Sequence, residues 1–99
     1  MPPSAKKRLE WRPAARLEFL EAIAYYADLN PAAAQRMRDE ICKAALTLID
    51  PFPTSGRPGR TAGTFERVVG RRTPFTLVYR EKGSVVQILR VLHQARKYP

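Results

Sequence analysis

The chain has 99 residues, of which 44% are hydrophobic and 27% are charged, enough for one small hydrophobic core but not for two. A single histidine and a single cysteine are too few ligands for a zinc site and cannot form a disulfide within the chain. No apolar run approaches the roughly 18 residues that span a bilayer, and the opening MPPSAKKR lacks the apolar stretch of a signal peptide. We therefore expect one cytoplasmic domain over residues 1–99, with residues 1–6 flexible and with no membrane contact, metal or cofactor.

The positive charge is concentrated in the second half of the sequence. The net charge is +9; residues 1–50 hold eight Lys/Arg against seven Asp/Glu, a net +1, whereas residues 51–99 hold ten against two, a net +8. Such a field attracts phosphate backbones or acidic protein segments and speeds their encounter. Charge alone does not choose between a nucleic acid and an acidic protein as the partner.

The first predicted elements are a strand and a helix. In residues 7–11, KRLEW, apolar and polar side chains alternate, which is typical of a half-buried strand. Pro13 suits the first turn of a helix, which we expect to extend to about Asp28. Tyr25 and Tyr26 are expected in the core and at its edge. The core-facing side of this helix is predicted from apolar residues at helical spacing, which are Ala15, Phe19, Ala22, Ile23 and Tyr26, with Leu17 and Leu20 widening the arc.

A second helix follows after a very short loop. Asn30 can cap its N-terminus, Pro31 fits the first helical position, and Asp50-Pro51 ends it. Because the loop has only two or three residues, the two helices should form an antiparallel hairpin. Cys42 lies at an apolar spacing and is expected to be a small buried hydrophobic residue. The apolar stripe of the second helix comprises Ala34, Met37, Ile41, Ala45 and Leu48.

The rest of the chain is a loop followed by three strands. Residues 51–63, PFPTSGRPGRTAG, hold three prolines and three glycines, so no regular element is expected there. Strands are predicted at Thr64–Val69, Phe75–Arg80 and Val85–Leu92, with a tight hairpin turn around Gly83. The order is β-α-α-β-β-β, an α+β domain in which a helical hairpin packs on one face of a small, mostly antiparallel sheet. The other face of the sheet, or its edge, is left open.

The chemistry of the second half rests on arginines and on the histidine. Guanidinium groups bind phosphates and carboxylates through paired hydrogen bonds, although the same arginines could form a solvated face. His93 could serve as an acid or base near pH 7, or it could be a packed, hydrogen-bonded structural residue. Tyr98 could stack on a base or belong to a frayed terminus. The arginines on or beside the strands are Arg57, Arg60, Arg67, Arg71, Arg72, Arg80, Arg90 and Arg96.

In their order and spacing, several stretches resemble the RelE/ParE superfamily of toxins from bacterial type II toxin–antitoxin modules, over almost the whole chain. They are Trp11 with the Ala15–Tyr25 helix, NPAAA at 30–34, GRPGR at 56–60, GTFERVV at 63–69, PFTLVYR at 74–80 and VLHQAR at 91–96. The resemblance implies the β-α-α-β-β-β fold. It also implies one of two functions: RelE-like members cleave messenger RNA on the ribosome, whereas ParE-like members poison DNA gyrase and are not nucleases.

Departures from the RelE pattern favour the ParE-like branch. RelE-like enzymes carry an arginine in the third strand where this chain has Thr76, and a neutral hydroxyl cannot neutralise a developing phosphorane charge. Their second strand carries lysines, where this chain has Glu66 and Val68. Gln94 follows His93 in place of their tyrosine. The resemblance therefore favours a gyrase inhibitor that is not an enzyme.

The resemblance also supplies candidate residues and partners. A ParE-like toxin is expected to have no catalytic residue; in the alternative, a ribosome-dependent mRNA endoribonuclease, Arg80, Arg90 and His93 would act. The expected partner is a cognate acidic, ParD-like antitoxin in a hetero-oligomer, docked on the outer side of the helical hairpin and on uncovered sheet residues. DNA would be contacted only through the antitoxin or gyrase. The candidate target-binding residues are Arg60, Arg67, Arg80, Arg90, His93 and Arg96.

Overall fold

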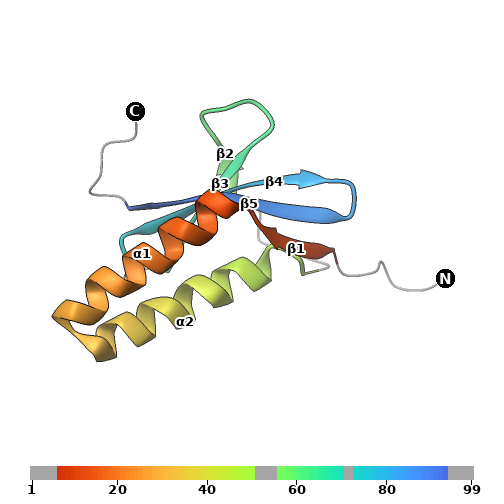
Figure 1. Cartoon of the computed structure of the whole chain (residues 1–99). Coiled ribbons are helices and arrows are strands. Elements are labelled where there is room, and N and C mark those ends of the chain that lie inside the picture. The colour runs from red at the N-terminus through yellow and green to blue at the C-terminus, as the bar shows by residue number, and fades with distance from the viewer. Residues whose placement is uncertain (1–6, 51–55, 71–72, 94–99) are drawn as a thin grey trace.

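The computed structural model describes residues 7–50, 56–70 and 73–93, and it has the predicted α+β architecture (Figure 1). The described residues form β1 (Arg8–Trp11), α1 (Pro13–Leu29), α2 (Pro31–Thr47), β2 (Arg57–Pro58), β3 (Phe65–Val68), β4 (Phe75–Lys82) and β5 (Val85–His93). The strands lie in the order β1-β5-β4-β3-β2. β1 runs parallel to β5, and the other neighbours are antiparallel, so the sheet is mostly antiparallel, as predicted.

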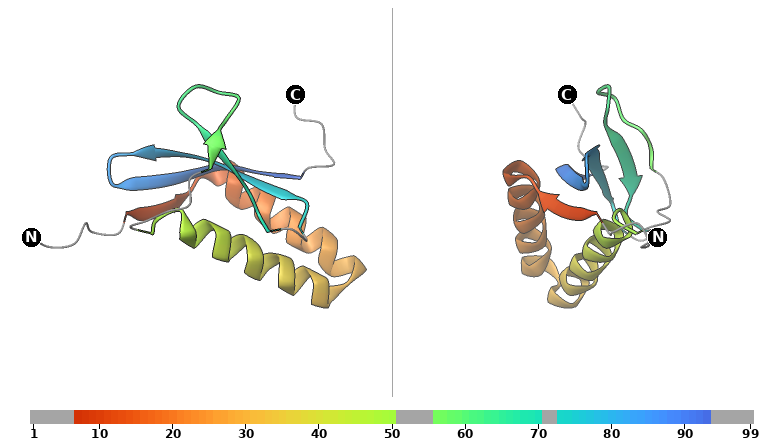
Figure 2. Two further views of the ribbon diagram at one scale, coloured as in Figure 1. Left: turned by 180° about the vertical axis from the view of Figure 1, so that it is seen from behind. Right: turned by 90° about the vertical axis from the view of Figure 1, so that its right-hand side faces the viewer.

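Both helices lie on the same side of the sheet and form an antiparallel hairpin (Figure 2). A single residue, Asn30, separates them, and its side chain accepts a hydrogen bond from the Ala33 backbone N–H at 3.1 Å. The Asn30 backbone N–H donates to the Tyr26 carbonyl at the end of α1. One residue therefore satisfies backbone groups at both helix ends, which confirms the predicted cap.

The core lies between the helical hairpin and the sheet. Its largest fully buried side chains include Ile41 of α2, Phe75 and Leu77 of β4, and Ile88 of β5. Burying a side chain of this size contributes roughly 1.5–3 kcal/mol, so these four residues hold the two layers together. The predicted stripe of α2 is confirmed, because its members are buried or pack against the core: Ala34, Met37, Ile41, Ala45 and Leu48.

A short fifth strand lies where the sequence predicted no regular element. Arg57 and Pro58 form β2 and pair with the first two residues of β3 at the edge of the sheet. Proline is tolerated at a sheet edge, because its missing N–H is not needed there. Gly59 donates its N–H to the Thr64 carbonyl at 2.8 Å, and a Cβ on Gly59 would collide with the Thr64 side chain. The prediction was wrong because pairing with β3 outweighs the low strand propensity of proline and glycine.

α1 is apolar around most of its circumference, and the predicted core face was too wide. Leu17, Leu20 and Tyr25 have exposed fractions of 57%, 55% and 62%, and Leu29 is exposed as well. A helix can turn only one arc toward its neighbours, so the core positions assigned to Leu17, Leu20 and Tyr25 were wrong. The remaining predicted positions are buried or pack against the core, namely Ala15, Phe19, Ala22, Ile23 and Tyr26.

Cys42 is half-buried, so the expectation that it is a buried core residue was wrong. Ile41, one position before it, is fully buried. Successive helical residues differ by about 100° in direction. Cys42 therefore lies at the edge of the apolar stripe of α2, whereas Ile41 lies at its centre.

Several expectations fall on residues that the structure does not describe. These are the flexibility of residues 1–6 and the roles of Arg71, Arg72, Arg96 and Tyr98. Among the described residues, no helix is both long and apolar enough to cross a membrane. The same residues contain no group of three or more His, Cys, Asp or Glu side chains that could hold a metal ion.

Candidate target-binding surface

The sheet has one face covered by α1 and α2 and one face without a helical layer (Figures 1 and 2). Along β4, Phe75, Leu77 and Tyr79 belong to the core on the helix side. Because strand residues alternate between faces, Thr76 and Val78 point to the other side, which we call the open face because it carries no helix, although both residues are buried, at 7% and 6% exposure. This alternation decides which charged side chains can meet one another.

Three polar side chains form a row across the open face. Glu10 of β1 pairs with Gln87 of β5, and Gln87 pairs with Arg80 of β4. Gln87 Oε1 accepts a hydrogen bond from Arg80 Nε at 2.6 Å, and Gln87 Nε2 donates to Glu10 Oε1 at 3.2 Å. The same Glu10 oxygen accepts from Arg12 Nη1 at 2.9 Å. We call Arg12, Glu10, Gln87 and Arg80 the polar relay.

The polar relay is buried at its centre and exposed toward its ends. Gln87 is 7% exposed, whereas the side chains of Arg12 and Glu10 are 48% and 39% exposed. The hydrogen bond from Arg12, followed by that from Gln87, lowers the pKa of Glu10 below its ordinary value of 4.5, against the opposing effect of desolvation. Glu10 is therefore ionised at neutral pH, and the relay alternates cation, anion, amide and cation.

Arg90, near the far end of β5, is held in a two-pronged ion pair by α1. Its Nε lies 2.9 and 3.0 Å from the two carboxylate oxygens of Glu18, and its Nη2 lies 2.7 Å from Glu18 Oε2. Glu18 Oε1 also accepts the Val91 backbone N–H at 3.0 Å. β1 pairs only with Val85–Ile88 of β5. Beyond Ile88, Glu18 supplies the acceptor for the Val91 N–H that a neighbouring strand would otherwise supply. Arg90 is thus part of what holds α1 to the sheet.

His93 lies on the helix-covered side at the end of β5. Its Nε2 is 2.7 Å from the Tyr26 hydroxyl oxygen. Its ring stacks on Tyr26 with a centroid distance of 6.2 Å and meets Phe75 edge-on at 5.3 Å. Of the two alternatives that the sequence allowed, the geometry matches the packed, hydrogen-bonded residue.

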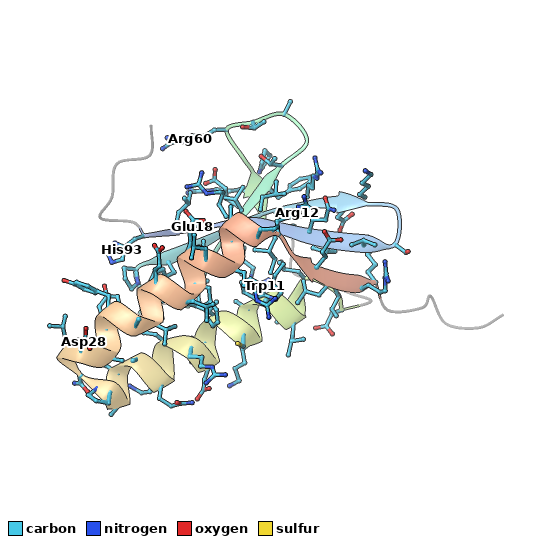
Figure 3. The ribbon with its side chains drawn as sticks, in the orientation of Figure 1. Trp11, Arg12, Glu18, Asp28, Arg60 and His93 are labelled. Carbon is cyan, nitrogen blue, oxygen red and sulfur yellow. The ribbon has the colours of Figure 1, made fainter. Side chains whose placement is uncertain are left out.

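The remaining candidates occupy other parts of the molecule. Arg60 is exposed on the loop between β2 and β3, which projects away from the helices, while His93 lies beside α1 (Figure 3). Arg67 is half-buried on β3 opposite Leu77, on the helix side of the sheet. Arg96 lies outside the described residues. The five candidates within the described residues are therefore not gathered at one point, and Arg80 is the one that belongs to the polar relay.

Sequence reasoning missed Glu10, Gln87 and Glu18. Gln87 did carry a signal, because it interrupts the apolar run VVQIL of the last strand. Glu10 showed only the ordinary polar half of a strand alternation. Glu18 gave no signal, since its partner Arg90 is 72 residues away in the sequence and no local pattern reports such a contact.

Known proteins are similar to this chain over almost its whole length. The family described as the ParE toxin of the type II toxin–antitoxin system parDE matches residues 9–98. The candidate toxin Y4kP of Sinorhizobium fredii is 35% identical over 95 residues, which is 96% of either chain.

Two solved structures extend the likeness to three dimensions. A chain of the chromosomal ParDE system of P. aeruginosa matches with a TM-score of 0.79 and 26% identity, over 89% of this chain and 96% of that one. A chain of the RelBE2 toxin–antitoxin complex of Mycobacterium tuberculosis matches with a TM-score of 0.61 and 26% identity, over 94% and 97%. Fold and sequence together place this chain in the ParE toxin family of type II toxin–antitoxin systems.

Proposed function

We propose that this toxin poisons DNA gyrase in the cytoplasm by protein–protein binding and that it is not a nuclease. Family membership supports a toxin of a type II toxin–antitoxin module. The likeness to both ParDE and RelBE2 chains leaves two targets, gyrase and ribosome-bound messenger RNA, to be separated by the arrangement of the charged residues.

The observation that carries the proposal is the separation of residues that a ribonuclease would need together. Arg80 pairs with Gln87, and His93 pairs with Phe75, five positions away along β4. At a strand rise of about 3.4 Å per residue this separation is roughly 17 Å. Arg80 also lies on the open face, whereas His93 contacts α1 on the helix side. A general acid or base must lie within hydrogen-bond reach of the proton it transfers, so this arrangement favours binding over catalysis.

The surroundings of Thr76 and Arg90 favour the same conclusion. Thr76 is 7% exposed and uncharged, so it cannot supply the cation that phosphoryl transfer requires. The fork of Arg90 is already occupied by both oxygens of Glu18. Neither residue is arranged to stabilise charge on a scissile phosphate.

Two assays with the purified toxin test the proposal. Added to a gyrase supercoiling reaction, the toxin should stop supercoiling; added to a translating extract, it should leave messenger RNA uncut in primer-extension mapping. Cuts at codon boundaries together with unaffected supercoiling would establish the ribonuclease instead.

The expected neutralising partner is a cognate acidic antitoxin, as in the ParDE and RelBE2 systems that this chain resembles. The outer side of α1 provides an apolar surface for it, because Leu17, Leu20 and Leu29 are all more than half exposed. Such a helix face fits an amphipathic segment that folds on binding. Positive charge on the toxin should speed the encounter, while the apolar contacts set the lifetime.

Co-expression with the adjacent reading frame tests this surface. Replacing Leu17 and Leu20 together by Ser should abolish co-purification of the neighbour-encoded protein, whereas Leu46→Ser, at a leucine of similar exposure on α2, should preserve it. Raising the salt concentration should slow association more than it speeds dissociation. If co-purification survives the double substitution, the antitoxin binds another face of the toxin.

A further inference from the structure

Gln87 is a buried amide that interrupts the apolar run Val85–Leu89 of β5. It is 7% exposed, and its neighbours Val86 and Ile88 are fully buried in the core on the other side of the sheet. Its side chain bonds to Arg80 on one side and to Glu10 on the other. Within the described residues no buried side-chain polar atom lacks a hydrogen-bond partner, so this amide is satisfied entirely through the relay.

The stability of the fold gives little reason for an amide at this position. Glu10 is partly exposed and Arg80 is exposed, so both could hydrogen-bond to water if residue 87 were apolar. Replacing a buried polar group by an apolar one is nearly neutral when no partner is left buried and unpaired. A leucine or methionine at 87 would also have extended the apolar strand. What the amide adds is a fixed orientation for Arg80.

We propose that Gln87 is a positioning residue that holds Arg80 ready to bind a carboxylate on the protein target. A guanidinium has five N–H donors, and among the described residues the structure gives Arg80 a hydrogen-bond partner only at Nε. That bond restrains the guanidinium and leaves its Nη donors for a ligand. Because an ordered long side chain loses less freedom on binding, the fixed fork binds its anion more tightly than a free one.

The charge of the relay favours a carboxylate over a nucleic-acid backbone. Arg12 and Arg80 are cations and Glu10 is an ionised carboxylate, so the relay presents one net positive charge. Binding to duplex DNA draws on several cations arranged along the phosphates, and the carboxylate of Glu10 opposes that. One oriented fork matches one carboxylate. This inference rests on the proposed function, because it takes a gyrase subunit as the source of the carboxylate.

A double-mutant cycle on gyrase binding tests the inference. Gln87→Leu should weaken binding of the full toxin to gyrase by roughly 3- to 10-fold, the range expected when one long side chain must be ordered anew. In a toxin that already carries Arg80→Ala, adding Gln87→Leu should change binding by less than about 2-fold, because the two residues act as one unit. Gln35→Leu makes the same chemical change at an exposed position of α2 where Gln35 bonds to Asp39, and it should leave binding unchanged.

Two further readouts distinguish orientation from a loss of structure. In the free toxin, the Arg80 Nε–H should exchange slowly with water by nuclear magnetic resonance and should exchange fast in Gln87→Leu, while the urea unfolding midpoint stays close to that of the parent. If the two substitutions add independently in the cycle, or if Arg80→Ala leaves gyrase binding intact, the inference is overturned while the proposed function stands. If the unmodified toxin does not bind gyrase, the proposed function is wrong, and the inference that Arg80 binds a carboxylate of gyrase is wrong with it. If the parent toxin binds duplex DNA in the absence of gyrase and Arg80→Ala does not, Arg80 binds a phosphate rather than a carboxylate. That result would overturn the assignment.

Discussion

The two ends of the β4–β5 hairpin differ in how they hold their polar side chains: one end leaves an arginine exposed, whereas the other fastens an arginine and a histidine to α1. Near the turn, Gln87 holds exposed Arg80 through Nε. At the far end, both oxygens of Glu18 hold Arg90, and Tyr26 bonds to His93. This difference shows that a positively charged residue in a strand does not by itself indicate a function. The partner that the fold supplies decides whether a cation fastens elements together or faces outward.

The largest expected effect is at the far end. Glu18→Ala removes the acceptor of Arg90 and of the Val91 N–H, so it should lower the free energy of unfolding by about 2 kcal/mol. This value is smaller than that for breaking a fully buried ion pair, because both side chains are partly exposed. Urea unfolding followed by circular dichroism measures the change.

Glu21→Ala, at an exposed position on the same helix, is the matched control for Glu18→Ala. It should change the unfolding free energy by less than about 0.5 kcal/mol. Equal losses in the two variants would mean that Glu18 contributes no more than an ordinary surface residue.

The next effect in size is at the turn end and concerns binding more than folding. Arg80→Ala should weaken gyrase binding about 10-fold, or about 1.4 kcal/mol, because a carboxylate of the target loses its guanidinium partner. The free energy of unfolding should fall by about 1 kcal/mol, less than in Glu18→Ala, because the variant leaves the buried Gln87 Oε1 without its donor. Titration calorimetry gives the affinity, and an unfolding midpoint that falls as steeply as in Glu18→Ala would contradict the contrast between the two ends.

A smaller effect is expected at His93. His93→Gln removes a packed ring and its hydrogen bond to Tyr26, so stability should fall by about 1 kcal/mol while growth inhibition remains. A catalytic acid or base would contribute roughly 10²- to 10⁴-fold. A folded variant whose toxicity drops on that scale, in a dilution assay on induced cells, would restore the ribonuclease.

The smallest effect is a pH dependence that comes from Glu10. Its pKa is lowered in the folded state by Arg12 and Gln87, so Glu10 adds stability above its ordinary pKa of 4.5 that is lost as the pH falls through the lowered value. The difference in urea midpoint between the parent and Glu10→Gln should therefore shrink in acid. A constant difference from neutral pH down to about pH 3 would show that Glu10 does not titrate as this coupling requires.

The sequence predicts most of the fold because the main elements have local signatures. The alternation in KRLEW, the Asn30-Pro31 cap and the turn at Gly83 each mark an element that the structure contains. β2 was missed because two residues have no periodicity of their own and depend on pairing with β3. The exposed side of α1 was misassigned because an apolar stretch does not say which of its arcs faces the sheet.

The candidate site is less predictable than the fold. Arg80 was identified from its residue type and strand, but its partner Gln87 and the acid Glu10 come from two other strands. Arg90 carries the same charge on the neighbouring strand and has a structural partner instead. Only the side-chain partners, Gln87 for Arg80 and Glu18 for Arg90, distinguish the two arginines, and both partners come from other elements of the fold.

The most direct test of the proposed mechanism is the amount of gyrase-cleaved plasmid that accumulates when the toxin is added to gyrase, supercoiled DNA and ATP. Poisoning predicts that linear plasmid rises with toxin concentration, that Gln35→Leu matches the parent toxin, and that Arg80→Ala needs about 10-fold more protein for the same cleavage. Absence of cleaved plasmid at saturating toxin, with the unmodified chain folded, would contradict the assignment of gyrase as the target.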